Sequence, residues 1–126
     1  MNDGTFLLRQ VSPSFVQLGR VTSQAFRPTP KDEGKLSAYD GDKITPEKSW
    51  VHYTTQLKHK SVGTLAVTVL ECKQEALTAS PDPDEFPEHV VIDFSAVTAS
   101  QAEKKSKKLR AVADARGWQY QAATDK

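Results

Sequence analysis

Five cationic side chains lie within seven residues near the end of this chain. They are Lys104, Lys105, Lys107, Lys108 and Arg110. Cationic groups gathered on one helix can bind the phosphates of a nucleic acid or the carboxylates of another protein. Because lysines sit on phosphate without reading base edges, a nucleic-acid contact here is expected to be independent of base sequence. The cluster also fits a solvated helix face, so three explanations stay open.

The segment 80–88 is acidic and rich in proline, and it ends directly before His89. Clustered carboxylates can ligate a hard divalent cation. The prolines between them hold the backbone extended, however, so the carboxylates are expected to point apart. We therefore predict no metal and no cofactor, and we interpret Asp82, Asp84 and Glu85 as part of a surface that binds a partner.

The histidines and the single cysteine do not form a catalytic set by sequence spacing. His89 and Asp93 share one face of a strand, but roughly 13 Å of extended backbone separates them, so each needs a partner from elsewhere. His52 and His59 lie roughly 10 Å apart on one helix face, too far to share a metal ion. Cys72 stands in an apolar run without a cationic neighbour, which predicts an inert thiol.

The common catalytic motifs, such as G-x-S-x-G, the P-loop, G-x-G-x-x-G and H-E-x-x-H, do not occur in this sequence. One enzyme class is still suggested by a short resemblance. Arg9 in the first predicted strand, with Thr22 and Ser23 in the second, resembles the arginine and hydroxyl-bearing strand that hold NAD in ADP-ribosyltransferase-type folds. The resemblance has no matched glutamate. It implies a nucleotide site that includes Arg9 and Ser23, although both also fit ordinary strand positions.

Several segments have the alternating apolar pattern or β-branched content of strands. The run 64–72 is apolar on both faces, which predicts a central strand. The run 35–39 is expected to pair back onto 20–26 as a hairpin. Its long tip, 27–34, exposes Arg27 and Lys31 as further candidate binding residues. The predicted strands are 5–11, 20–26, 35–39, 64–72, 89–94 and 118–122.

Two segments have helix signals. Thr45 followed by Pro46 predicts a helix over 46–58, with an inward stripe of Trp50, Val51, Tyr53, Thr54 and Leu57. Ser100 with Glu103 forms a capping box that opens a second helix over 100–116, whose stop is Gly117. Strands and helices do not alternate strictly. The sequence therefore predicts an α+β domain, with a mixed or mostly antiparallel sheet packed against two helices.

The composition limits the remaining possibilities. The chain has 126 residues, 37% of them hydrophobic, and carries 17 cations against 16 anions. This size predicts one domain over residues 1–126. The balanced charge excludes overall attraction to nucleic acid, so any such contact must come from the cationic cluster. The lone cysteine predicts a reducing compartment, the cytoplasm, and no stretch is apolar enough for a membrane partner.

Taken together, these features favour a non-catalytic domain that binds another protein, in the manner of an immunity protein, antitoxin or accessory subunit. The absence of a reaction centre and the presence of charged loops carry this hypothesis. Nucleic-acid binding through the helix over 100–116 is the first alternative. An NAD-dependent ADP-ribosyltransferase-like enzyme is the second.

Overall fold

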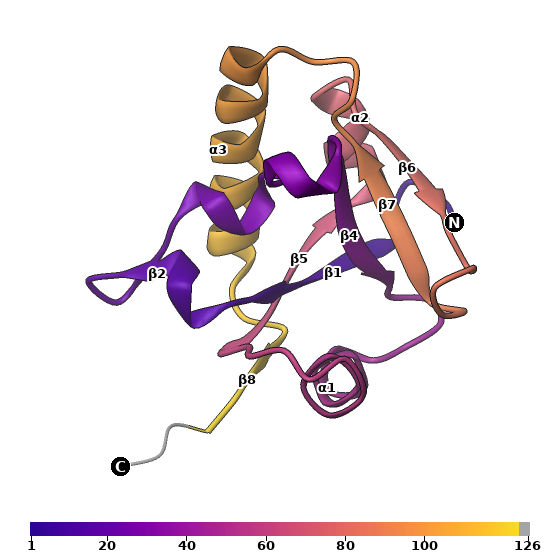
Figure 1. The fold of residues 1–126 in the computed structure, drawn as a ribbon, viewed down its shortest axis with the longest axis vertical. Coiled ribbons are helices and arrows are strands. Elements are labelled where there is room, and N and C mark those ends of the chain that lie inside the picture. Colours follow the sequence, from indigo (N-terminus) through magenta and orange to yellow (C-terminus); the bar gives the residue numbers. More distant parts are fainter. Residues whose placement is uncertain (124–126) are drawn as a thin grey trace.

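The computed structural model describes residues 1–123, and most of its strands form one antiparallel sheet. Every neighbouring pair in this sheet is antiparallel, which confirms the predicted α+β class (Figure 1). In sheet order the strands are β6 (Thr78–Pro81), β7 (His89–Asp93), β4 (Lys35–Asp40), β1 (Phe6–Val11), β5 (Gly63–Thr68) and β8 (Tyr120–Gln121).

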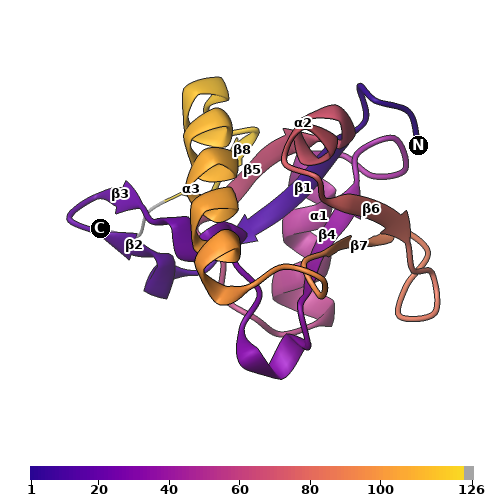
Figure 2. The same cartoon turned by 90° about the horizontal axis from the view of Figure 1, so that it is seen from above.

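Helices cover both faces of this sheet (Figures 1 and 2). The helices are α1 (Pro46–Val51), α2 (Val69–Gln74) and α3 (Ala99–Arg116). On the larger face, Leu109 and Ala113 of α3 pack into a core that includes Leu7, Leu65 and Ile92. The opposite face carries a smaller cluster, centred on Leu8, Tyr39 and Ala66, against which Tyr53 and Phe86 pack.

The sheet opens between β1 and β4. Strand β1 pairs with β5 along its whole length, from Phe6 to Val11, but with β4 only at Leu7 and Leu8. Beyond Leu8 the two strands separate, and β4 follows β7 instead. Figure 1 shows this divergence, with β1 and β4 running away from a shared end. The next residue of β1, Arg9, therefore lies at the opening.

A buried polar network fixes α1 over the smaller face. Gln10 of β1 donates from Nε2 to the hydroxyl of Ser49, at 2.9 Å. Its Oε1 accepts from Ser61 and Thr64, both at 3.0 Å. Because Gln10, Ser49 and Thr64 are buried, removing one partner would leave an unsatisfied polar group in the core. The network thus holds α1 and the residues after it at a defined position beside the opening.

The prediction of one strand over 64–72 is wrong in its second half. Strand β5 ends at Thr68, and α2 begins at Val69. The hydroxyl of Thr68 accepts from the backbone of Glu71, and the Glu71 carboxylate accepts from the backbone of Thr68. This capping box satisfies the first turn of α2 and turns the chain out of the sheet. The first half is confirmed, since five of the six β5 residues are buried.

The predicted helix over 46–58 is shorter and less regular. Its start at Pro46, capped by Thr45, is confirmed, but α1 ends at Val51 and continues as a π-helical turn, His52–Gln56. Hydroxyls of this turn donate back to helix carbonyls, which competes with regular helical bonding. The inward stripe is wrong for Val51 and Leu57, whose exposed fractions are 44% and 37%.

Other elements also differ from the sequence prediction, among them the strand over 118–122, which is reduced to β8. The run 20–26 divides into β3 (Arg20–Val21), which pairs with β2 (Val16–Gln17), and a 3-10 helix, Ser23–Phe26. β4 therefore pairs with β1 and β7 rather than with this run. The cap of α3 is Thr98 with Gln101, not Ser100 with Glu103.

Within residues 1–123, no helix combines the length and apolar character needed to cross a membrane.

Candidate functional site

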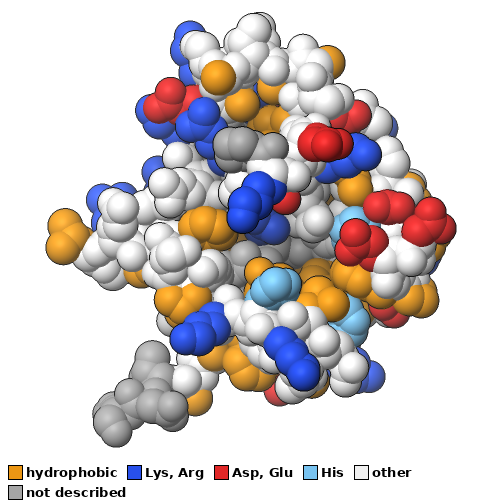
Figure 3. All heavy atoms as spheres, viewed as in Figure 1, with side chains coloured by type: hydrophobic (Ala, Val, Ile, Leu, Met, Phe, Trp, Pro, Cys, Tyr) orange, Lys and Arg blue, Asp and Glu red, His pale blue; other side chains and the backbone are white. Residues whose placement is uncertain are grey.

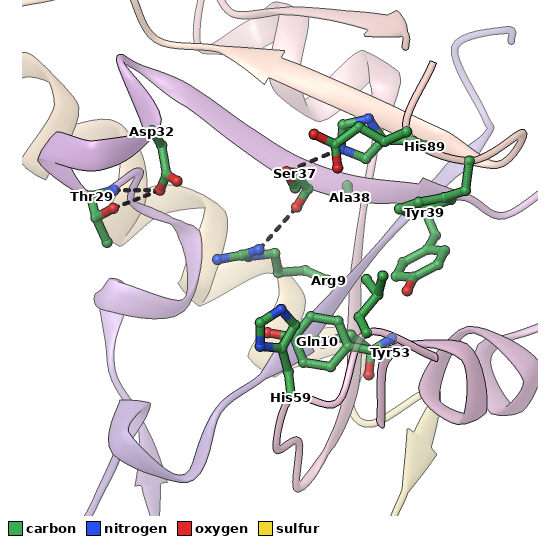
Figure 4. A pocket seen from close by; sticks show the side chains of 13 residues that line it. Arg9, Gln10, Thr29, Asp32, Ser37, Ala38, Tyr39, Tyr53, His59 and His89 are labelled. Atoms are coloured by element: carbon green, nitrogen blue, oxygen red, sulfur yellow. Dashed lines mark hydrogen bonds between the residues drawn. The ribbon is translucent and has the colours of Figure 1, made fainter. Parts of the chain in front are cut away.

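A pocket of about 320 Å³ lies at the opening between β1 and β4 (Figure 4). Arg9 of β1 and Ser37 of β4 come from the two strands that separate. Tyr53 and His59 reach it from the π-helical turn and the segment that follows, and Glu85 belongs to the β6–β7 connection. Four separate regions of the chain thus bring polar side chains to one hollow.

Arg9 is the cation of this pocket. Its Nε donates to the carbonyl of Ala25, at 2.6 Å, and its Nη1 donates to the carbonyl of Ser37, at 3.0 Å. In the part of the chain that the structure describes, Arg9 has no ion pair with a carboxylate. Burial lowers the pKa of the guanidinium, an effect that nearby Tyr53 and Asp32 oppose. A partly buried cation that is held only by neutral carbonyls favours an anionic ligand.

A hydrogen-bonded chain runs along the β4–β7 side of the pocket. His89 Nε2 lies 3.1 Å from the Ser37 hydroxyl oxygen. His89 Nδ1 lies 3.2 Å from a carboxylate oxygen of Asp82 and 3.0 Å from its carbonyl oxygen. The partners of His89 thus lie outside its own strand, Ser37 in β4 and Asp82 directly after β6.

Aromatic rings form the α1 side of the pocket. The rings of Tyr53 and His59 lie 4.9 Å apart and tilted by 38°, below Arg9 in Figure 4. Phe86 packs against Tyr39 at 5.0 Å, and burial raises the pKa of the Tyr39 hydroxyl. Such faces can stack on a planar heterocycle. Figure 3 shows histidine side chains gathered at the centre of this face, with acidic ones beside them.

The predicted binding residues of α3 are not among those that line this pocket. Several pair with nearby acids: Lys107 with Glu103 at 3.3 Å, Lys108 with Glu75 at 3.7 Å, and Arg110 with Asp114 at 3.8 Å. Lys104 is exposed. Neighbouring carboxylates reduce the cationic field that the helix presents to a partner.

The other predicted binding residues lie in four places. Arg27 lines a second, mostly apolar hollow near the start of α3, and Lys31 is exposed in the 3-10 helix Pro30–Asp32. Asp84 is exposed in the β6–β7 connection. Asp82 and Glu85 belong to the pocket region described above. The structure therefore does not gather the nine predicted residues on one surface.

The other residues considered for catalysis or metal binding either have structural contacts or lie apart from one another. His52 bonds the Tyr39 hydroxyl at 2.7 Å, and His59 stacks on Tyr53, so they do not converge on a metal. Among residues 1–123, no group of three metal-ligating side chains comes together. Cys72 is buried in α2, and burial raises the pKa of its thiol to about 12. Ser23 opens a 3-10 helix and does not line the Arg9 pocket.

Comparison of the chain with protein-family models, with curated proteins and with solved structures finds no match.

Sequence reasoning missed Ser37 and Tyr53 as pocket residues. Ser37 is an isolated serine in an alternating strand, and no motif surrounds it. Its contact with His89 depends on strand pairing. Tyr39 lies opposite His89, so Ser37, two residues before Tyr39, is diagonal to His89 on the same face of the sheet. Two residues could have indicated the pocket from the sequence. Arg9 is a charged residue in an apolar strand, and His89 has no partner within its own strand.

Proposed function

We propose that this protein binds NAD in the Arg9 pocket and transfers or hydrolyses its ADP-ribose group. The observation that carries the proposal is the partly buried Arg9 guanidinium, which faces the pocket without a carboxylate partner in residues 1–123. Two backbone carbonyls use two of its five N–H donors, so donors remain for a pyrophosphate. Arg9 is also the residue that resembles the NAD-binding arginine of ADP-ribosyltransferase-type folds, although Ser23, the other part of that resemblance, lies outside the pocket.

The rest of the pocket suits the chemistry of the nicotinamide ribose. Its volume, about 320 Å³, is at the small end of ligand pockets, which fits one nucleoside half of a dinucleotide. Tyr53 and Phe86 offer aromatic faces for the base. When the glycosidic bond breaks, positive charge develops on the ribose, and a carboxylate stabilises it. Glu85, an exposed carboxylate that lines the pocket, can supply that charge.

The test is NAD binding by isothermal titration calorimetry together with nicotinamide release by chromatography. Glu85→Gln should still bind NAD but release nicotinamide at least about a hundredfold more slowly, the usual effect of removing one electrostatic contact to a transition state. Arg9→Lys keeps the charge but removes the planar fork, and should weaken binding about tenfold. Arg20→Gln, at an exposed arginine of β3, is the matched control. A folded wild-type protein that neither binds NAD nor releases nicotinamide would refute the proposal.

Protein binding, the function favoured first by the sequence, stays a second proposal. The observation in its favour is Leu18, whose side chain is fully exposed at the tip of the projecting β2–β3 ribbon (Figure 2). A lone apolar side chain on a protruding turn can insert into a partner's pocket. If so, Leu18→Ser should abolish the co-purification of a stoichiometric partner while leaving the protein folded.

A further inference from the structure

The hydrogen bonds that link Asp82, His89 and Ser37 are directed so that His89 can accept a proton from Ser37. Nδ1 of His89 faces two acceptors, the carboxylate and the carbonyl of Asp82, so the neutral imidazole carries its proton on Nδ1. Its Nε2 then has the lone pair, and the Ser37 hydroxyl donates to it across 3.1 Å. The direction of every hydrogen bond in the chain follows from these acceptors.

Strand pairing fixes this chain. Tyr39 of β4 lies opposite His89 of β7, which places Ser37, two residues away, at a diagonal position on the same face. Asp82 follows the last paired residue of β6, and its backbone N–H donates to the His89 carbonyl at 2.8 Å. Ser37 and His89 thus come from neighbouring strands, and Asp82 comes from the residue directly after β6, beside β7.

The three groups differ in their exposure to solvent. The side chain of His89 is 4% exposed, whereas that of Asp82 is 41% exposed. Ser37 is exposed and lines the pocket, close to Arg9. A ligand in the pocket can therefore touch the Ser37 hydroxyl, while the imidazole behind it is shielded from water. Figure 4 shows Ser37 between His89 and Arg9.

We propose that Ser37 is a catalytic residue and that His89 and Asp82 position and activate it by accepting its proton. The proposal rests on the proposed NAD chemistry for its substrate. An incoming hydroxyl or water attacks the anomeric carbon of the ribose, forming a C–O bond. The C–N bond breaks, and its electron pair leaves on nicotinamide, which becomes neutral. The nucleophile gives its proton to the Ser37 oxygen as the Ser37 proton passes to His89 Nε2, and Asp82 balances the imidazolium.

A fluorophosphonate probe tests the activated serine without NAD. Attack by the Ser37 oxygen forms a P–O bond, fluoride leaves, and the proton passes to His89. Mass spectrometry should find the label on Ser37, with none in Ser37→Ala and labelling about tenfold slower or more in His89→Gln and Asp82→Asn. Ser80→Ala is the matched control, because Ser80 is an exposed strand serine opposite the same residue, Val91, and does not line the pocket.

The nicotinamide assay then separates this proposal from the function on which it rests. In Ser37→Ala, kcat should fall about a hundredfold, while KM for NAD stays within about threefold of wild type because Ser37 acts on the reacting groups rather than on affinity. If wild type releases no nicotinamide, the NAD proposal fails, and the labelling result still decides the activation of Ser37. Absence of label at Ser37 would overturn the inference. So would labelling that is as fast in His89→Gln and Asp82→Asn as in wild type.

Discussion

Arg116, in the last turn of α3, offers the most quantitative test of how the fold is held together. Its guanidinium forms a fork with the Glu71 carboxylate of α2, at 2.9 and 2.7 Å. It also donates to the carbonyl of Ala66 at 2.8 Å and lies 5.1 Å from the ring centroid of Phe6. One side chain thus joins α3, α2 and the sheet, so Arg116→Met should loosen all three elements.

The magnitude follows from partial burial. The side chains of Arg116 and Glu71 are 24% and 19% exposed, so this ion pair is intermediate between a surface pair and a buried pair. A surface pair contributes about 0–1 kcal/mol, and disruption of a buried pair costs about 3–5 kcal/mol. We expect a decrease of about 2 kcal/mol in the free energy of unfolding, measured by urea denaturation. For a domain of this size that corresponds to about 8 °C in Tm.

The same pair predicts a dependence on pH. Burial alone would raise the pKa of Glu71, but hydrogen bonds from Arg116 and Thr68 outweigh it and lower that pKa. A lowered folded-state pKa contributes stability above the ordinary glutamate value of about 4.3, and this contribution is lost as pH falls through the folded value. Arg116→Met should therefore lose less stability than wild type on acidification below about pH 4.3.

Lys107→Met supplies the control for this experiment. Lys107 pairs with Glu103 at 3.3 Å on the same helix, but its side chain is 62% exposed. Its replacement should change the free energy of unfolding by about 0.5 kcal/mol or less. If Arg116→Met were as mild as Lys107→Met, the fork would contribute no more than a surface pair, and the reasoning from burial would be refuted.

Three further outcomes are expected. Val67→Asp should abolish folding, since Val67 is fully buried and an unpaired carboxylate there costs several kcal/mol of a total of about 5–15; a near-native melting curve would contradict this. Native Cys72 should resist Ellman's reagent because burial raises its thiol pKa to about 12, and Cys72→Ala should cost about 1–2 kcal/mol by denaturation without changing activity. Replacing Lys104, Lys107 and Lys108 with Gln should leave the circular dichroism spectrum unchanged. If α3 binds nucleic acid, the slope of log K against log salt concentration should fall by roughly 0.9 for each phosphate that the helix no longer neutralises. An unchanged slope would indicate a solvated face.

Much of the fold was predictable because it depends on local patterns. Strand β1 and the start of α1 at Pro46, capped by Thr45, follow from periodicity and from a hydroxyl cap. The error at 64–72 arose because a short apolar run fits both a strand and a buried helix. Thr68 and Glu71 carried the deciding signal, since their spacing is that of a capping box.

The site was less accessible to prediction because its residues meet through strand pairing. Arg9 was a candidate only through its resemblance to the arginine of ADP-ribosyltransferase-type folds, and Ser23, its companion in that resemblance, does not line the pocket. Ser37 and Asp82 reach His89 only once β4, β6 and β7 are in register. Register depends on the whole sheet rather than on a local motif.

The order of the strands also has a consequence for folding kinetics. Only β5 pairs with β1 along its full length, and the chain between them includes β4 and α1. The central ladder, in which Leu7 meets Val67 and Leu8 meets Ala66, cannot form until this long loop has closed. Loop closure costs entropy before any burial compensates for it, which places such a topology among slow-folding domains, with times of about milliseconds to seconds. During that interval the edge of β1 that later pairs with β5 is open, so refolding at high concentration should compete with aggregation.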